Sequence, residues 1–232
     1  MTAPSQTSRP RRKTSTLPPM QVARVTLPDE IYRQLKSMIL DGGLIPGELV
    51  TIQGLANAFG VSAMPVREAL QRLTAERALT VISGRSVGIP EVDSGRLRDL
   101  TRVRVEIESL AAQWATPHVT AADLAKLELL VETMARAAND GDTPAYVRGN
   151  HEFHFTVYGA AGSETLLSTI EGLWLQVSPY FHLLHGSGNY LAANEEHRLI
   201  LQAIRGGNAD GCAAHVRADI LSATDVLLKL LS

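Results

Sequence analysis

Residues 55–73 of the chain read LANAFGVSAMPVREALQRL, and this stretch decides the fold of the N-terminal part. Gly60 is placed to end one short apolar helix, and Ser62 is a good N-cap for the next, which extends to about Ala75. The apolar residues of this second helix recur at the spacing of one buried face: Val66, Ala69, Leu70 and Leu73. Two helices joined by a tight turn are the core of a helix-turn-helix.

The flanking residues complete a small module of helices and strands. Apolar residues at helical spacing predict a helix over 28–40, with Pro28 in its first turn. After the capped helix, apolar runs at 79–82 and 87–90 surround a turn that contains Gly84, which predicts a β-hairpin. Helix, helix, turn, helix and hairpin, in this order, are typical of a winged helix-turn-helix.

The outer face of the capped helix carries the side chains that a DNA-reading helix needs. With the apolar stripe buried, Met64, Arg67 and Gln71 point outward, and Arg72 flanks them. Ser62 and the first amides of the helix are suited to a backbone phosphate. A solvated helix face without a partner has the same pattern, so both interpretations stay open at this point.

Charge is unevenly divided along the chain. Residues 1–92 carry eleven Lys and Arg against seven Asp and Glu, whereas residues 93–232 carry eleven against seventeen. Such a division suits a chain of which only the first part meets a polyanion, although unequal surfaces without a partner are also common. Residues 1–26, rich in Ser, Thr, Pro, Arg and Lys, predict a disordered basic tail.

From residue 93 the pattern is helical to the end of the chain. The spacing of apolar residues predicts helices over 95–116, 120–139, 144–160, 163–183, 194–206 and 208–231. We therefore expect a mainly α protein. Its parts are the tail over 1–26, a winged helix-turn-helix with a hairpin wing over 27–92, and an all-helical bundle over 93–232.

Composition narrows the class of protein. Cys212 is the single cysteine, so no intrachain disulfide and no thiolate zinc cluster can form. No apolar run reaches the roughly 18 residues of a membrane-spanning helix, so we expect no membrane partner and a cytoplasmic location. The chain has no nucleophile elbow, phosphate-binding loop or dinucleotide fingerprint, and His151 and His154 are too close in sequence for a zinc-peptidase motif.

Three of the expected bundle helices each place one histidine towards the apolar interior: His154, His197 and His215. Asn150 lies one turn before His154 and shares its helix face. Core histidines that bond backbone carbonyls account for this pattern. A metal site with positions open for water or a carboxylate accounts for it as well, because neutral imidazoles suit Zn(II) or Ni(II).

The N-terminal module resembles the GntR family of bacterial transcription factors. The resemblance covers a Gly- and Pro-containing turn at 43–48, the pattern L-A-x-x-x-G-V-S at 55–62 and P-V-R-E-A-L-x-R-L at 65–73. A match of this length is far more specific than a single short motif. The resemblance implies that the chain is a DNA-binding regulator.

The DNA contacts that the resemblance implies fall on the capped helix and on the wing: Ser62, Arg67, Arg72, Gly84 and Arg85. Ala63 stands where the family usually has a base-contacting arginine, and Met64 where a threonine is common. One lost arginine–guanine pair removes about 1–3 kcal/mol of discrimination. We therefore expect an operator that differs from the family consensus.

The bundle resembles the FCD domain of the FadR-like branch of the same family. The matching stretches are RVEIE at 104–108, NHEFH at 150–154, EHRLI at 196–200 and AH at 214–215. The resemblance implies a divalent metal, zinc or nickel, bound by four side chains: Asn150, His154, His197 and His215. Asn150 replaces an aspartate found in many members, which removes one negative charge.

Arg104 heads the first bundle helix at the position that the resemblance assigns to an anionic effector. Its guanidinium fork suits a carboxylate, and the effectors implied are small hydroxy, keto or sugar acids. Spacing alone also allows a surface ion pair between Arg104 and Glu108, four residues apart.

Together these features predict a homodimeric regulator, and a repressor rather than an activator. It is expected to bind a palindromic operator in double-stranded DNA, with an affinity that a small carboxylate effector controls. The alternatives are a metal-dependent hydrolase or a metal sensor that uses His154, His197 and His215.

Overall fold

The computed structural model describes residues 26–91 and 93–231, so the predicted tail lies outside the described residues except for Thr26. The N-terminal part of the chain folds into three helices and a small sheet. Its elements are α1 (Leu27–Leu40), β1 (Leu49–Thr51), α2 (Ile52–Phe59), α3 (Ala63–Ala75), β2 (Thr80–Ser83) and β3 (Ser86–Gly88). This is the predicted winged helix-turn-helix, with β2 and β3 as the wing.

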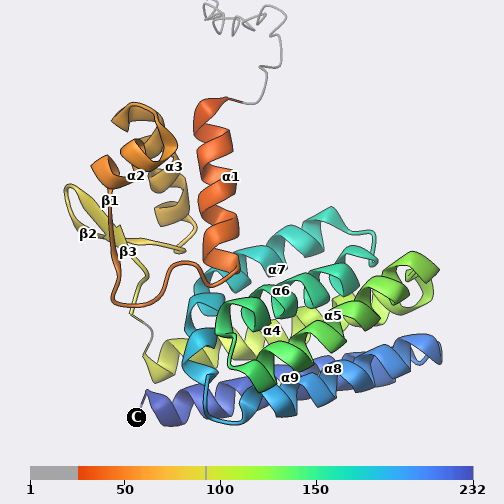
Figure 1. Cartoon of the computed structure of the whole chain (residues 1–232). Coiled ribbons are helices and arrows are strands. Elements are labelled where there is room, and N and C mark those ends of the chain that lie inside the picture. The colour runs from red at the N-terminus through yellow and green to blue at the C-terminus, as the bar shows by residue number, and fades with distance from the viewer. Residues whose placement is uncertain (1–25, 92, 232) are drawn as a thin grey trace, which may run out of the picture.

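The C-terminal part is the predicted helical bundle. Its elements are α4 (Ser94–Ala115), η1 (Thr116–His118), α5 (Ala121–Asp140), α6 (Thr143–Gly159), α7 (Glu164–Val177), η2 (Ser178–Leu184), α8 (Asn189–Arg205) and α9 (Ala209–Leu230). The long helices lie side by side, and the N-terminal part is seated on one side of them, with the end of α1 near α6 and α7 (Figure 1). No helix within the described residues is long and apolar enough to span a membrane.

Local sequence signals fix the start and the end of the N-terminal helices. Thr26 and Asp29 form a capping box that starts α1. Gly60 ends α2 with a φ of 66°, a left-handed conformation that costs glycine little. Ser62 is the N-cap of α3, but its hydroxyl makes no capping hydrogen bond. The predicted stripe of α3 is buried against α1 and α2: Val66, Ala69, Leu70 and Leu73.

The sheet contains one strand that the sequence did not predict. Its strand order is β1-β3-β2, and β3 pairs antiparallel with both neighbours. The unpredicted strand, β1, has only three residues and no buried side chain, so it lacks the alternation by which a strand is recognised. It holds the base of the wing against the start of α2.

Two predicted helix boundaries in the bundle were wrong. The helix expected over 163–183 ends at Val177, where Pro179 turns the chain into the 3₁₀ helix η2. The helix expected from 194 begins at Asn189, after Gly188 with a φ of 80°. Asn194, where the helix was expected to begin, lies inside it with its side chain buried, and its amide donates to the carbonyl oxygen of Val131 at 3.3 Å.

The C-terminal end of α1 is fixed to the bundle by polar contacts. Nζ of Lys36 lies 2.6 Å from Oε2 of Glu171 on α7. The hydroxyl of Ser178 donates to the carbonyl oxygen of Ile39 at 3.2 Å. Nδ1 of His151 on α6 lies 2.9 Å from Oδ1 of Asp41. These contacts place α1 between α3 and the bundle.

The contact between His151 and Asp41 is the polar centre of this junction. Burial alone would raise the pKa of Asp41. The hydrogen bond and the electrostatic interaction with His151 lower this pKa by more than burial raises it, so the net shift is downward. Next to this pair, a Cβ atom at Gly42 would lie 2.9 Å from Cγ1 of Val147 on α6. The chain therefore approaches α6 more closely at Gly42 than any side chain would allow.

We predict a coupling energy of about 0.5–1 kcal/mol between His151 and Asp41 in a double-mutant cycle with alanine, because the pair is half-buried. The measurement is urea unfolding of the four proteins at pH 7, where Asp41 is ionised. Lys126 and Glu152 form the control pair, since Glu152 is also on α6 and both side chains are about half exposed. Their coupling should be near zero. Equal coupling energies for the two pairs would contradict the prediction.

Candidate functional site

The outer face of α3 and the wing form one surface. Ser62, Met64, Arg67 and Gln71 are exposed, and Met64 is 65% exposed although it is apolar. A shallow groove runs between the helix and the hairpin, lined by Ile52, Arg67, Leu70, Gln71, Thr74, Val81, Ser83, Gly84, Ser86 and Val87. A helix and a wing on one face of the molecule are what a winged helix-turn-helix presents to DNA.

The two arginines predicted to contact DNA from α3 differ in their surroundings. The guanidinium of Arg72 lies 2.6 Å from Asp29 and 3.9 Å above the ring of Tyr32, both on α1. It therefore ties α3 to α1. Arg67 has no such partner among the described residues, and neither does Arg85 at the tip of the wing. Their charges are available for phosphates or bases.

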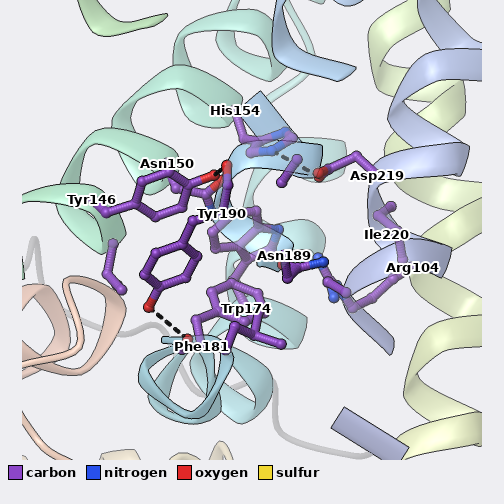
Figure 2. Close-up of a pocket in the computed structure, with 14 residues that line it drawn as sticks. Arg104, Tyr146, Asn150, His154, Trp174, Phe181, Asn189, Tyr190, Asp219 and Ile220 are labelled. Atoms are coloured by element: carbon purple, nitrogen blue, oxygen red, sulfur yellow. Dashed lines mark hydrogen bonds and ion pairs between the residues drawn. The ribbon is translucent and has the colours of Figure 1, made fainter. Parts of the chain in front are cut away.

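The bundle contains an enclosed pocket to which five helices and η2 contribute (Figure 2). The lining residues are Arg104 from α4; Tyr146, Val147, Asn150 and His154 from α6; Trp174 from α7; Phe181 and Leu184 from η2; Asn189, Tyr190 and Ala193 from α8; and Asp219, Ile220 and Ala223 from α9. The free space is about 20 Å³, enough for one water molecule. The side chains that line the pocket therefore lie too close together in this structure to admit anything larger than water.

Three buried side chains converge beside this pocket. Nε2 of His154 lies 3.2 Å from Nε2 of His197 and 3.2 Å from Oδ2 of Asp219. Oδ1 of Asp219 lies 3.9 Å from Nε2 of His197. All the ligand atoms of this group lie within 4.8 Å of one another. Asn150 lines the pocket one turn before His154 on α6.

Burial and close neighbours shift the ionisation of two of these groups. Burial lowers the pKa of His197 to about 3, so its imidazole is neutral at physiological pH. Burial also raises the pKa of Asp219, but its contact with His154 and the charged groups around it lower this pKa more, so the net shift is downward. Imidazole nitrogens and a carboxylate are a donor set that suits Zn(II) or Ni(II).

The positions of the donor atoms are the second test of fit. Nε2 of His154 and Nε2 of His197 point at each other, and both lie within 3.9 Å of the carboxylate of Asp219. Nδ1 of His197 is buried and has no hydrogen-bond partner among the described residues, so this imidazole lacks the second hydrogen bond that usually orients a ligand. The donor set and its convergence fit a metal ion.

His215 was predicted as a metal ligand, but the structure does not bring it to this group. Its Nδ1 lies 2.8 Å from Oε2 of Glu196, and its side chain is about one third exposed. Asp219, one turn later on α9, takes its place. The sequence offered Asp219 as a candidate, because His215 and Asp219 are four residues apart and so lie on the same face of the helix. The resemblance of Ala214-His215 to the family pattern favoured His215 over Asp219.

A buried carboxylate connects Arg104 to this group. Glu108 is fully buried and accepts hydrogen bonds from Arg104 at 2.7 Å, from the hydroxyl of Tyr158 at 2.8 Å and from the indole of Trp174 at 2.9 Å. Spacing allowed a surface ion pair of Arg104 and Glu108; the ion pair exists, but both residues are in the core. Sequence reasoning also missed Tyr158 and Trp174 as partners.

The hydroxyl of Tyr158 connects Glu108 to His154. Burial and the charge of Glu108 raise the pKa of Tyr158 well above its usual value, so the phenol keeps its single proton and donates it to Glu108. The hydroxyl also lies 3.0 Å from Nδ1 of His154 and must accept there. With a metal bound, Nδ1 of His154 would donate its proton to this hydroxyl, and Nε2 would be the ligand atom.

Arg104 also presents a free edge to the pocket. Nε and Nη2 are bonded to Glu108, whereas Nη1 has no acceptor among the described residues. The guanidinium carbon lies 5.4 Å from the ring centre of Trp174 and 5.9 Å from that of Phe181. The free edge is suited to one carboxylate.

Comparison with known proteins covers both parts of the chain. Residues 27–89 match the family described as bacterial regulatory proteins, gntR family, and residues 99–222 match the FCD domain. The HTH-type transcriptional regulator McbR of Escherichia coli (strain K12) is 31% identical over 90% of this chain and 95% of its own. The HTH-type transcriptional repressor GlaR of the same strain is 29% identical over 62% and 67%.

A solved structure of E. coli McbR/YncC superimposes with a TM-score of 0.82, over 90% of this chain and all of the other, at 29% identity. These relatives are transcriptional regulators and not enzymes, so the hydrolase alternative is not supported.

We propose that His154, His197 and Asp219, with Asn150, hold one divalent metal, and we predict that His197→Ala abolishes its retention. Wild-type protein incubated with zinc and desalted should keep about one equivalent, and the variant should bind at least about 100-fold more weakly. The measurement is competition against a chromophoric chelator, with circular dichroism to verify folding.

His215→Ala is the matched control and should keep its zinc with an affinity within about threefold of the wild type. An equal loss in the two variants would contradict the assignment of Asp219 in place of His215.

Proposed function

Because the chain belongs to the GntR family of bacterial transcriptional regulators and carries an FCD domain, we propose how its regulation works. A homodimer binds a palindromic operator and releases it when a small carboxylic acid enters the bundle pocket. The observation that carries this proposal is the position of α6, because one helix both lines the pocket and contacts the end of α1.

The pocket and the junction share two elements. On α6, Val147 lines the pocket and lies against Gly42, and His151 bonds Asp41. On η2, Phe181 lines the pocket, while its neighbour Tyr180 donates to the carbonyl oxygen of Pro90, just after the wing. An acid that separates the pocket walls has to shift α6 or η2, so it also shifts α1 and the linker.

The other end of α1 transmits such a shift to the DNA-reading helix. Asp29 and Tyr32 hold Arg72, and the hydroxyl of Tyr32 donates to Glu76 at 2.8 Å. A movement of α1 therefore carries α3 with it. In a two-fold dimer this changes the distance between two recognition helices that have to fit half-sites one turn of DNA apart.

In the proposed mechanism the metal helps to bind the effector in the bundle pocket. His154, His197, Asp219 and Asn150 would hold it, and when bound it supplies a Lewis acid that takes up a carboxylate oxygen. Arg104 binds the same acid through its free guanidinium edge, and the Glu108–Tyr158 pair holds both Arg104 and His154 in orientation.

Repression is the mode we propose, in line with the name of the relative GlaR, and the place of action is the cytoplasm, where the operator is. Arg67, Gln71 and the wing tip would read the DNA, with Ser62 on a phosphate. A metal sensor is the second candidate, because the same helices connect the metal ligands to α1.

We predict that Arg67→Ala lowers operator affinity about 10-fold or more, because one base or phosphate contact is worth about 1–3 kcal/mol. The operator is selected from a random library with the wild-type protein, and binding is followed by fluorescence anisotropy. Arg136→Ala, an exposed arginine on α5, is the control and should bind like the wild type.

Random DNA of the same length should bind at least about 1000-fold more weakly. Equal affinity for selected and random DNA would rule out the regulator proposal. Zinc that changes operator affinity in the absence of any acid would favour the metal sensor.

An exposed apolar face of α4, beside the one that carries Arg104, supports the homodimer. Val103, Ile107, Leu110 and Trp114 recur at i, i+4, i+7 and i+11, and Trp114 is 47% exposed. Leu221 of α9 extends this stripe and shares a groove with its first half. An apolar stripe of this length on a polar helix marks an interface between proteins. A stripe along one helix can pair with its own copy about a two-fold axis, so we assign it to a second copy of the chain.

We predict that Leu110→Glu converts the dimer into a monomer, because two charges would be buried facing each other across the two-fold axis. Sedimentation velocity at about 5 μM separates the two species. The control is Leu129→Glu, which replaces an equally apolar, exposed residue on α5 outside the stripe. This control should stay dimeric. A Leu110→Glu protein that remains a dimer would place the interface elsewhere.

A further inference from the structure

The walls of the pocket are mostly apolar and aromatic. Nine of the fourteen lining residues belong to these classes: Tyr146, Val147, Trp174, Phe181, Leu184, Tyr190, Ala193, Ile220 and Ala223. Asn150, His154 and Asp219 lie at the metal corner. Only Arg104 and Asn189 remain as polar groups on the other walls. The body of a ligand therefore lies among rings and methyl groups.

The two tyrosine hydroxyls offer no free proton to a ligand. Tyr146 donates to the carbonyl oxygen of Tyr190, and Tyr190 donates to that of Phe181, both at 2.9 Å. Nδ2 of Asn189 donates to Ser222 at 3.3 Å. A hydroxyl on the body of a ligand would lose its water and find few partners, at a cost of about 1–3 kcal/mol each. A polyhydroxylated acid is therefore a poor fit.

The charges around the pocket determine how many carboxylates a ligand can carry. The positive charge of Arg104 and the negative charge of Glu108 cancel. A divalent ion brings two positive charges, and Asp219 brings one negative charge, so the loaded pocket has one positive charge in excess. One carboxylate neutralises it, whereas a second would be buried without compensation. An aspartate in place of Asn150 would remove this excess.

The shape of the walls indicates the shape of the ligand. The rings of Tyr146 and Tyr190 are stacked, 3.9 Å apart and 12° from parallel. Trp174 and Phe181 meet edge to face, 5.6 Å apart, on another wall (Figure 2). Ring faces pack best against a flat partner. The walls enclose space for only one water molecule, so they have to separate before a ligand can enter. A thin ligand requires a smaller separation than a thick one.

On the premise of the proposed function, we infer that the effector is a monocarboxylic acid with a flat, apolar, aromatic or conjugated body. Its carboxylate binds the metal and the free edge of Arg104, and its body lies between the tyrosine pair and the rings of Trp174 and Phe181. Sugar acids and dicarboxylic acids are disfavoured, the first by the walls and the second by the charge.

The test is isothermal titration calorimetry of the full-length, zinc-loaded protein with four probe acids. Benzoate should bind at least about 10-fold more tightly than gluconate, which has one carboxylate and many hydroxyls, and than phthalate, which adds a second carboxylate to the same ring. Cyclohexanecarboxylate, similar in size but not flat, should bind at least about 3-fold more weakly than benzoate. Removal of zinc should weaken benzoate binding at least about 10-fold.

Two variants of α4 locate the binding. Arg104→Lys keeps the charge beside Glu108 but has no second edge for a ligand, so benzoate should bind about 10-fold more weakly. Arg98→Lys, on the exposed side of the same helix, should leave the affinity unchanged.

Gluconate, phthalate or cyclohexanecarboxylate binding as tightly as benzoate would overturn the inference, and so would the failure of all four acids to bind. Operator binding is measured separately. Selective DNA binding without this acid preference leaves the proposed function in place, whereas the acid preference without selective DNA binding contradicts that function.

Discussion

The carboxylate of Glu108 is the interaction on which the interior of the bundle depends. A fully buried negative charge is costly unless it is compensated, and here donors from α4, α6 and α7 compensate it. Those donors are fixed in return: Arg104 can present only one edge to the pocket, and Tyr158 can present only a lone pair to His154. The apolar core positions the helices, and this network sets the orientation of the polar groups between them.

The consequence is a site in which position and protonation are set together. The ligand atoms of His154, His197 and Asp219 meet in the folded protein, and burial keeps the imidazole of His197 neutral, as a ligand has to be. The same helix that carries His154 carries His151 three residues earlier, on the side that faces the end of α1. Helical geometry alone thus connects the interior of the bundle with the DNA-binding part.

The sequence predicts the elements better than it predicts their partners. The stripe from Val66 to Leu73, Pro28 in a first turn and Ser62 as an N-cap are local signals, so the winged helix-turn-helix could be predicted. The helical spacing of apolar residues after residue 93 likewise predicted the bundle. The strand β1 could not be predicted, because three residues are too few to show an alternating pattern. It forms because it pairs with β3, which lies far away in the sequence. Asp219 was missed because the choice between two residues one turn apart on α9 depends on how that helix is rotated against α6 and α8, which is a property of the packing. The pairing of His151 with Asp41 joins residues 110 positions apart, and no local signal reports it.

The closed pocket has a consequence for the sensitivity of the regulator. Its free space holds only one water molecule, so the proposed effector would bind only to molecules whose walls have separated. Its apparent affinity would then be the intrinsic one multiplied by the fraction of open molecules. Selection can therefore tune the concentration at which the switch responds without altering one contact to the ligand. The turn between Gly186 and Gly188, whose glycines have left-handed φ angles of 76° and 80°, precedes Tyr190 and is one place for such tuning. Substitutions there would set the threshold of the response, while the lining residues would set the identity of the signal.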